Sequence, residues 1–180
     1  MKYQKLIVII TISCVLYVVS VGAAMAELEG CGDGLLINEE LDGSLRITGD
    51  EPCTIISSTI GGNIHAINLP YVLLMNNKVG GYLRIDGNAG IGTANVIANT
   101  VLRDYIVVNE LQDANVIENE TLADGIYVVN NVNALVQKNI SKQELICIWN
   151  TDLDSFFNFA GGTLNCGNEP EVPEEPPAGE

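Results

Sequence analysis

The chain has 180 residues, of which 23 are acidic and 8 are basic, giving a formal net charge of −15. Such a charge repels phosphate backbones and anionic membranes, so it argues against nucleic acid as a partner. A single histidine and the lack of C-x-x-C spacing argue against a zinc site. The composition suits a soluble extracellular protein, or one that collects cations.

Residues 1–26 have the plan of a secretory signal peptide. Lys2 and Lys5 precede an uncharged apolar stretch at 6–23, and Ala24-Met25-Ala26 resembles a cleavage site. An uncleaved anchor is the alternative, because about 18 apolar residues reach the lower limit for crossing a bilayer. We expect cleavage, secretion to the periplasm or the extracellular space, and no membrane association afterwards.

Four cysteines remain once the predicted signal peptide, which contains Cys14, is removed. An even number of cysteines in a secreted chain predicts two disulfides, and three pairings are possible. The positions favour Cys31–Cys53 and Cys147–Cys166, one bridge at each end of a repeated region.

That region is clearest at 94–154, where three segments share one pattern: ANVIANTVLRDYIVVNELQD, ANVIENETLADGIYVVNNVN and ALVQKNISKQELICIWNTDLD. Upstream, LDGSLRITGD (41–50) recurs as VGGYLRIDGN (79–88), two units of 19 residues later. The short segments rich in Val, Ile and Tyr favour β-strands, and no segment shows a helical stripe. A repeat of 19–22 residues predicts an all-β parallel solenoid of about six coils over 35–153, with a longer turn at Gly87–Thr93.

Asparagines recur at fixed places in the repeats. Stacked coils place equivalent residues about 4.8 Å apart, so stacked Asn side chains can hydrogen-bond to one another. We expect two such ladders, Asn99/Asn119/Asn139 and Asn109/Asn130/Asn150.

These coils resemble the right-handed parallel β-helix, the pectin-lyase-like superfold, over 35–153. The resemblance rests on the repeat pattern and not on a signature motif. That superfold includes polysaccharide lyases and hydrolases, adhesins and passenger domains, so it implies an architecture without carrying an activity across.

Two columns of charged residues are candidate sites. Arg46, His65 and Arg84 recur every 19 residues and should point outward, where they could bind an anionic sugar or discourage sheet-to-sheet association. The second column contains acidic residues that could bind Ca²⁺ or form a solvated turn: Asp104, Asp124 and Glu144. No other cofactor is expected.

Further along the same outer face, the pattern becomes apolar. The expected outward positions are Ile106, Tyr127 and Cys147, followed by Val108, Val129 and Trp149. An exposed apolar patch of this kind marks an interface. We expect the segment 155–166, with Phe156, Phe157 and Phe159, to cover the patch as a strap held by Cys147–Cys166, and a partner or a second copy is the alternative.

The sequence therefore predicts one β-helix domain at 27–166 and a disordered acidic, Pro-rich tail at 167–180. For function, it favours a non-enzymatic extracellular or envelope protein that presents a binding or scaffold surface to a glycan or a surface protein. A polysaccharide-binding or carbohydrate-active protein, of lyase or hydrolase type, is the alternative.

Overall fold

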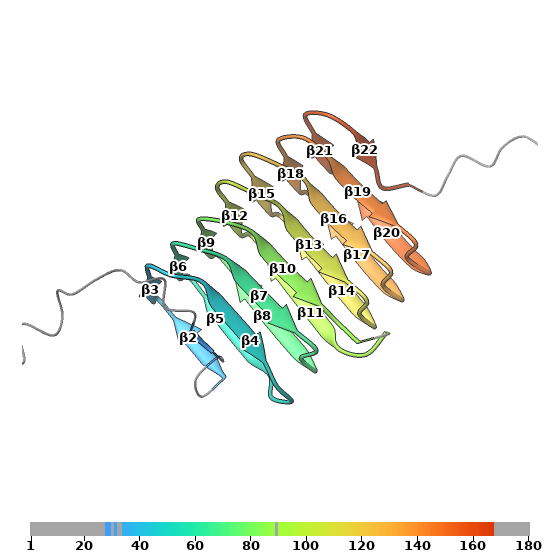
Figure 1. Ribbon diagram of the computed structural model, residues 1–180. Coiled ribbons are helices and arrows are strands. Elements are labelled where there is room, and N and C mark those ends of the chain that lie inside the picture. The colour runs from blue at the N-terminus through green and yellow to red at the C-terminus, as the bar shows by residue number, and fades with distance from the viewer. Residues whose placement is uncertain (1–27, 30, 32–33, 89, 168–180) are drawn as a thin grey trace, which may run out of the picture.

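The computed structural model describes residues 28–29, 31, 34–88 and 90–167, and within these ranges every regular element is a β-strand. Figure 1 shows the strands stacked as a β-solenoid of about seven turns. The fold is therefore the expected all-β parallel solenoid, with one turn more than the predicted six. The predicted signal peptide at 1–26 and the tail residues 168–180 lie outside the described residues.

Three parallel sheets form the sides of the solenoid, and the chain visits them in the order A, B, C in successive turns. Sheet A contains β1 (Leu28–Glu29), β4 (Leu45–Thr48), β7 (Ile64–Ile67), β10 (Leu83–Asp86), β13 (Ile106–Asn109), β16 (Ile126–Val129), β19 (Leu145–Ile148) and β22 (Leu164–Asn165). Sheet B contains β2 (Leu35–Ile37), β5 (Cys53–Ile56), β8 (Tyr71–Met75), β11 (Thr93–Ile97), β14 (Asp113–Ile117), β17 (Asn133–Gln137) and β20 (Asp152–Phe156). Sheet C contains β3 (Glu40–Leu41), β6 (Thr59–Ile60), β9 (Lys78–Val79), β12 (Thr100–Val101), β15 (Glu120–Thr121), β18 (Ile140–Ser141) and β21 (Phe159–Ala160).

The core lies inside the three sheets, because alternate residues of each strand point inward. In sheet A the register aligns one buried column from turn to turn: Leu45, Ile64, Leu83, Ile106, Ile126 and Leu145. Each such side chain stabilises the fold by roughly 1.5–3 kcal/mol relative to exposure. Stacking like residue on like residue thus builds one continuous core along the axis.

The chain passes from sheet B to sheet C through a two-residue corner. The first corner residue has a φ between 52° and 57° in all seven described corners: Asn38, Ser57, Asn76, Ala98, Glu118, Lys138 and Phe157. This left-handed conformation is unusual for residues with a side chain, so the surrounding contacts must impose it. The residue that follows supplies those contacts.

That second corner residue is an asparagine in five successive turns, which together form the Asn ladder: Asn77, Asn99, Asn119, Asn139 and Asn158. Asn119 shows the pattern, since its Nδ2 donates to the Val96 carbonyl at 2.7 Å and to Asn139 Oδ1 at 3.1 Å. Its own Oδ1 accepts from the backbone N–H and the Nδ2 of Asn99, at 2.9 and 3.0 Å. The structure therefore joins the three residues of the first predicted ladder and adds Asn77 and Asn158.

The second predicted ladder is only partly right, because Asn130 Nδ2 donates to Asn109 Oδ1 at 3.5 Å on the exposed surface while Asn150 pairs with a different residue. Asn109 aligns with Val129, 20 residues later, and not with Asn130. Asn130 is instead an exposed corner residue with a φ of 55°. Asn150 accepts hydrogen bonds from the backbone and the side chain of Asn131, both at 3.0 Å, so the ladder here contains Asn131 and Asn150.

Differences in repeat length are absorbed at the corners. Between β10 and β11, the described residues 87–88 and 90–92 belong to the long turn expected at Gly87–Thr93, and Thr93 is already the first residue of β11. Between sheets C and A, the turns at 102–105 and 122–125 are one residue longer than those at 61–63 and 80–82. The strands therefore keep their register although the repeat varies in length.

Both expected disulfides are present. Cys31–Cys53 joins the first two turns with a Cα–Cα distance of 5.7 Å, and Cys147–Cys166 joins the last two with a distance of 4.6 Å. Cys147 is buried in β19, so its bridge lies in the core and not on the outer face where it was expected.

The predicted strap is also wrong. Strands β20, β21 and β22 pair in parallel with β17, β18 and β19, so 152–166 adds a turn to the solenoid and does not cross sheet A. Asn158 explains this outcome, because it extends the Asn ladder through hydrogen bonds from Asn139. Phe156, Phe157 and Phe159 are exposed.

Candidate functional site

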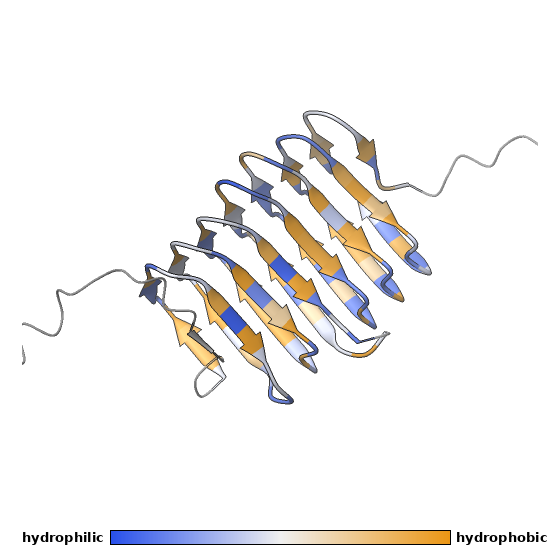
Figure 2. Cartoon of the chain, viewed as in Figure 1, coloured by the Kyte–Doolittle hydropathy of each residue, from blue (hydrophilic) through white to orange (hydrophobic). Residues whose placement is uncertain are grey.

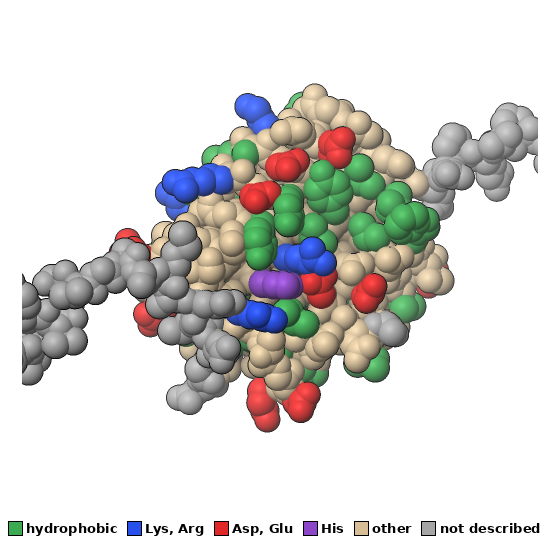
Figure 3. Space-filling model, viewed as in Figure 1, with side chains coloured by type: hydrophobic (Ala, Val, Ile, Leu, Met, Phe, Trp, Pro, Cys, Tyr) green, Lys and Arg blue, Asp and Glu red, His purple; other side chains and the backbone are tan. Residues whose placement is uncertain are grey.

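The outer face of sheet A brings together the basic residues singled out from the sequence. Arg46 pairs in register with His65, and His65 with Arg84, so the three form a column, here the basic column, across β4, β7 and β10. Figure 3 looks onto this face and shows the histidine between two basic side chains, with apolar side chains gathered beside them. The three residues that the 19-residue spacing grouped together are therefore adjacent on the surface.

Asp86, at the end of β10, sits beside the basic column. Its Oδ2 lies 2.7 Å from Arg84 Nε and 2.8 Å from His65 Nε2. Burial acts to raise the pKa of Asp86, but hydrogen bonds from Arg84 and His65 outweigh burial and hold that pKa below its ordinary value. The same hydrogen bond raises the pKa of Arg84. The face thus carries an ionised carboxylate held by two of the three column residues.

A row of tyrosines runs along the edge of this face and was not predicted. The rings of Tyr82 and Tyr105 are stacked with centroids 5.5 Å apart, and Tyr127 meets Tyr105 edge-on at 6.4 Å. His65 continues the row, edge-on to Tyr82 at 6.3 Å. The signal in the sequence is that Tyr82 and Tyr105 each directly precede the first buried residue of a sheet A strand.

Tyr127 is held in place by its neighbours. Its ring covers Gly125 so closely that a Cβ atom there would lie 2.7 Å from the phenolic oxygen. Its hydroxyl donates to Glu144 Oε2 at 3.1 Å. Burial, this hydrogen bond and the charges of Asp124 and Glu144 raise the pKa of Tyr127 to about 12.

We expect an absorbance titration of phenolate to show one tyrosine that ionises only near pH 12. Because the folded-state pKa lies above the ordinary value of about 10, the neutral phenol stabilises the fold below pH ~10 and this contribution is lost as the pH rises toward 12. Tyr127→Phe should abolish the late transition and Glu144→Gln should move it to lower pH, with circular dichroism confirming that the fold persists. A late transition that survives in Tyr127→Phe would contradict the assignment.

The apolar half of the face lies over β13, β16 and β19. Its partly exposed, outward side chains are Val107, Tyr127, Val129, Ile146 and Ile148. Figure 2 shows the same change in hydropathy, since β4 and β10 carry hydrophilic segments while β16 and β19 are largely hydrophobic. The predicted apolar outer surface is therefore present, with Tyr127 and Val129 as predicted and Val107, Ile146 and Ile148 in place of the other predicted residues.

Several residues predicted for that surface lie elsewhere. Ile106 and Val108 are fully buried, because Ile106 aligns with Ile126 and not with Tyr127. Trp149 is exposed, but it is a corner residue after β19, with a φ of 57°, and does not belong to the sheet. The prediction treated Asn109 and Asn130 as equivalent, but Asn109 aligns with Val129. This slip of one position exchanges the two faces of a strand.

The predicted acidic column is only partly present. Asp104 and Asp124 precede equivalent residues, Tyr105 and Gly125, whose carbonyls accept the backbone N–H groups of Leu83 and Ile106. Glu144 is equivalent to Gly125 and not to Asp124. Its carbonyl accepts the backbone N–H of Ile126, just as the Gly125 carbonyl accepts that of Ile106. Among the described residues, no group of three or more His, Cys, Asp or Glu side chains is arranged to hold a metal ion. The predicted calcium site is therefore not assembled by this column.

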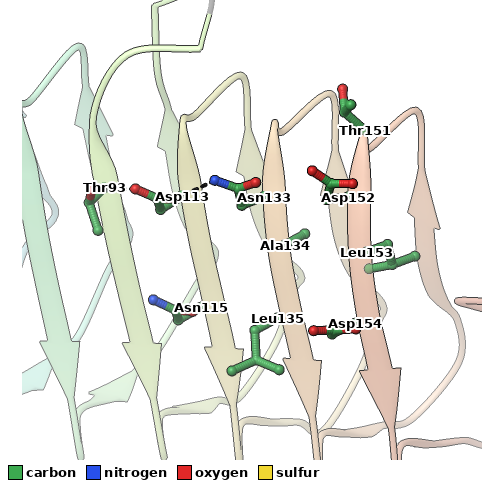
Figure 4. A pocket seen from close by; sticks show the side chains of 10 residues that line it. All are labelled: Thr93, Asp113, Asn115, Asn133, Ala134, Leu135, Thr151, Asp152, Leu153 and Asp154. Carbon is green, nitrogen blue, oxygen red and sulfur yellow. Dashed lines mark hydrogen bonds between the residues drawn. The ribbon is translucent and has the colours of Figure 1, made fainter.

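Sheet B carries a shallow hollow of about 620 Å³ that the sequence reasoning missed. Figure 4 shows polar side chains from β11, β14, β17 and β20 around it. Asp113, Asn133 and Asp152 stand in one column, and Asn133 Nδ2 donates to Asp113 Oδ1 at 2.7 Å. Their spacing of 20 and 19 residues was the signal that could have revealed them. The hollow is acidic and contains mainly hydrogen-bond acceptors.

Comparisons with protein-family models, with curated proteins and with solved structures gave no match. Within the part of the chain that the structure describes, no helix could serve as a membrane span. The likeness to a parallel β-helix therefore rests on the sequence repeats and on the stacked parallel strands.

Proposed function

We propose that this is a non-enzymatic, extracytoplasmic protein that binds a surface protein through the outer face of sheet A. The observation that carries the proposal is the change along this one face, from the basic column at β4–β10 to the apolar half at β13–β19. Two disulfides are compatible with an extracytoplasmic location.

The face has the composition of a binding surface. Partly exposed Val, Ile and Tyr side chains supply apolar contact area, and the arginines at one end supply charge that fixes orientation. Strands stacked in register repeat these groups at about 4.8 Å, which suits a flat or extended partner.

The carboxylates of this face support a binding role over catalysis. A general acid needs a pKa raised toward the working pH. The pKa of Asp86 is instead lowered, and Glu144 Oε2 accepts a hydrogen bond from the hydroxyl of Tyr127.

Binding through the apolar half is tested with Ile146→Glu, since Ile146 points outward from β19. Ile91→Glu is the matched control, because Ile91 is exposed in the long turn after β10. With extracellular and envelope proteins of the source organism as the probe, wild type and Ile91→Glu should retain the same protein and Ile146→Glu should lose it. Retention of every captured protein by Ile146→Glu would refute the assignment of this surface.

The second candidate function, binding or cleavage of an acidic polysaccharide, is favoured by the basic column and its neighbouring tyrosines. With polygalacturonate and alginate as probes, with and without Ca²⁺, Arg46→Ala/Arg84→Ala should weaken binding about tenfold at low salt, at roughly 0.5–1 kcal/mol per exposed charge. Lys138→Ala/Lys142→Ala removes equal charge from exposed corners and should change little. Equal loss in both double variants would indicate non-specific attraction, and no saturable binding would exclude this candidate. Product analysis of any bound polymer tests for cleavage.

A further inference from the structure

Trp149 occupies a backbone position that does not suit its side chain. It is the first residue after β19, and its φ is 57°. Asn68 and Asn130 adopt the same conformation after β7 and β16, and asparagine tolerates it better than a bulky residue does. Trp149 is 73% exposed, so packing within the chain does not offset this strain. Strained residues of this kind are concentrated at functional sites, including ligand clamps.

A hollow of about 430 Å³ lies beside Trp149, at the corner between sheets A and B. Its lining includes Glu110 and Asn130, which precede Trp149 at the same corner position in the two turns before it. Gly90, in the long turn after β10, and Val132 complete the part of the lining used here, and a Cβ atom on Gly90 would lie 3.3 Å from Val132 Cγ2. The hollow therefore combines an exposed aromatic ring with a carboxylate and an amide.

This corner hollow adjoins the larger hollow on sheet B, because Thr151 lines both of them. Beyond Thr151 lie Asp152 and Asp154, whose exposed side chains point outward from β20 (Figure 4). In the part of the chain that the structure describes, neither carboxylate is held by a hydrogen bond or an ion pair. A continuous surface thus leads from the indole ring of Trp149 to free hydrogen-bond acceptors.

The chemistry of this surface matches a neutral sugar. A pyranose ring has an apolar face of C–H groups that can pack on an aromatic ring, and its hydroxyl groups donate and accept hydrogen bonds. Glu110, Asp152 and Asp154 supply acceptors, whereas Asn130 and Thr151 can both donate and accept. An apolar surface with a few polar groups around it is the usual composition of a small-molecule site. The three carboxylates would repel an anionic sugar.

We propose that Trp149 and the adjoining hollow on sheet B form a binding site for a neutral oligosaccharide. One sugar ring stacks on Trp149, and the following units extend past Thr151 to the carboxylates of β20. This site lies on a different side of the solenoid from the outer face of sheet A, where we place the protein-binding surface. Either proposal can therefore fail without affecting the other.

The fluorescence of Trp149 reports on the site directly, because Trp149 is the only tryptophan in the sequence. The chain from Glu27 is titrated with cellohexaose, laminarihexaose, mannohexaose and chitohexaose in about 0.15 M salt. At least one of these sugars should shift the emission to shorter wavelength in a saturable manner, because the bound sugar removes water from the ring. If none of the four changes the emission, the proposal is wrong. A shift caused by hexalysine and by none of the sugars would assign the site to a cationic peptide instead.

Two aromatic variants test the role of the ring by calorimetry with the sugar that binds. Trp149→Asn removes the ring and introduces the residue that already occupies the equivalent position at Asn130, so the corner should still fold. Phe157→Asn is the matched control, because Phe157 has the same φ of 57° and is 80% exposed at the other end of β20. Trp149→Asn should weaken binding about tenfold or more, and Phe157→Asn should leave it unchanged. Equal loss in both variants would indicate non-specific attraction to exposed rings and would overturn the assignment.

The contribution of sheet B is tested with Asp154→Ala, which leaves the fluorescent residue in place. This variant should weaken binding of the hexasaccharide, since Asp154 lies in the sheet B hollow into which the longer sugar extends. An unchanged affinity would contradict the placement of the sugar across β20.

Discussion

Replacing Asn119 with Ala is expected to lower the free energy of unfolding by on the order of 4 kcal/mol. Asn119 makes four hydrogen bonds in the centre of the Asn ladder, two as donor and two as acceptor. Alanine would leave buried donors of Asn99 and the Val96 carbonyl without partners, at roughly 1–3 kcal/mol for each unsatisfied group.

The matched control is Asn115→Ala, in the same turn. Asn115 donates to Asn95 Oδ1 at 2.9 Å on the partly exposed outer face of sheet B, where water can replace the lost partner. Its loss should cost less than about 1 kcal/mol. Urea unfolding of both variants measures the difference, and equal destabilisation by the two would show that the ladder is no more important than a surface pair.

Removing the Cys147–Cys166 bridge with the double variant Cys147→Ala/Cys166→Ala is expected to destabilise the last turn by about 3 kcal/mol, as the chain-entropy model gives for loops of this size. The two cysteines are 19 residues apart and enclose β20, β21 and β22. Each turn of a solenoid contacts only its neighbours, so the loss should remain local. Hydrogen exchange in 152–165 should therefore accelerate roughly 100-fold, at 1.4 kcal/mol per tenfold change.

The other bridge provides the control for this effect. Cys31→Ala/Cys53→Ala removes a bridge that spans 22 residues at the opposite end, so it should accelerate exchange in the first turn and leave 152–165 unchanged. If either double variant accelerated exchange equally in all turns, the molecule would be opening as one unit and the local account would fail.

The architecture could be predicted because it depends on features that repeat. Asn99, Asn119 and Asn139 recur every 20 residues and form hydrogen bonds in successive turns, so their spacing reports the stacking directly. The basic column was found for the same reason, since Arg46, His65 and Arg84 lie in turns of equal length.

The faces of later strands could not be predicted in the same way. A strand exchanges its two faces when the register slips by one residue. Ile106 and Val108 were expected outside because Asn109, Asn130 and Asn150 were taken as equivalent, whereas Asn109 aligns with Val129 and Val129 with Ile148. Only three-dimensional stacking shows which residues are equivalent when the turns differ in length, and the same alignment placed Glu144 in the wrong column.

The last turn was misjudged for a different reason. The aromatic residues Phe156, Phe157 and Phe159 were expected to cover an apolar surface, which is the usual behaviour of large apolar side chains. In the structure, the Asn158 side chain and the parallel pairing of β20 outweigh that tendency and leave the rings exposed. One buried polar residue thus decided the path of the segment.

The Asn ladder also bears on how the chain would mature in a pathway that glycosylates asparagine. Asn119-Glu120-Thr121 and Asn139-Ile140-Ser141 are acceptor sequences for N-linked sugar, which is attached to the side-chain nitrogen. In the folded chain the Nδ2 atom of Asn119 gives one hydrogen to the Val96 carbonyl and the other to Asn139 Oδ1, and the residue is buried. A glycan would replace one of those hydrogens and would need a path to solvent through the packed corner. Sugar attachment and completion of the fold therefore exclude one another at this nitrogen.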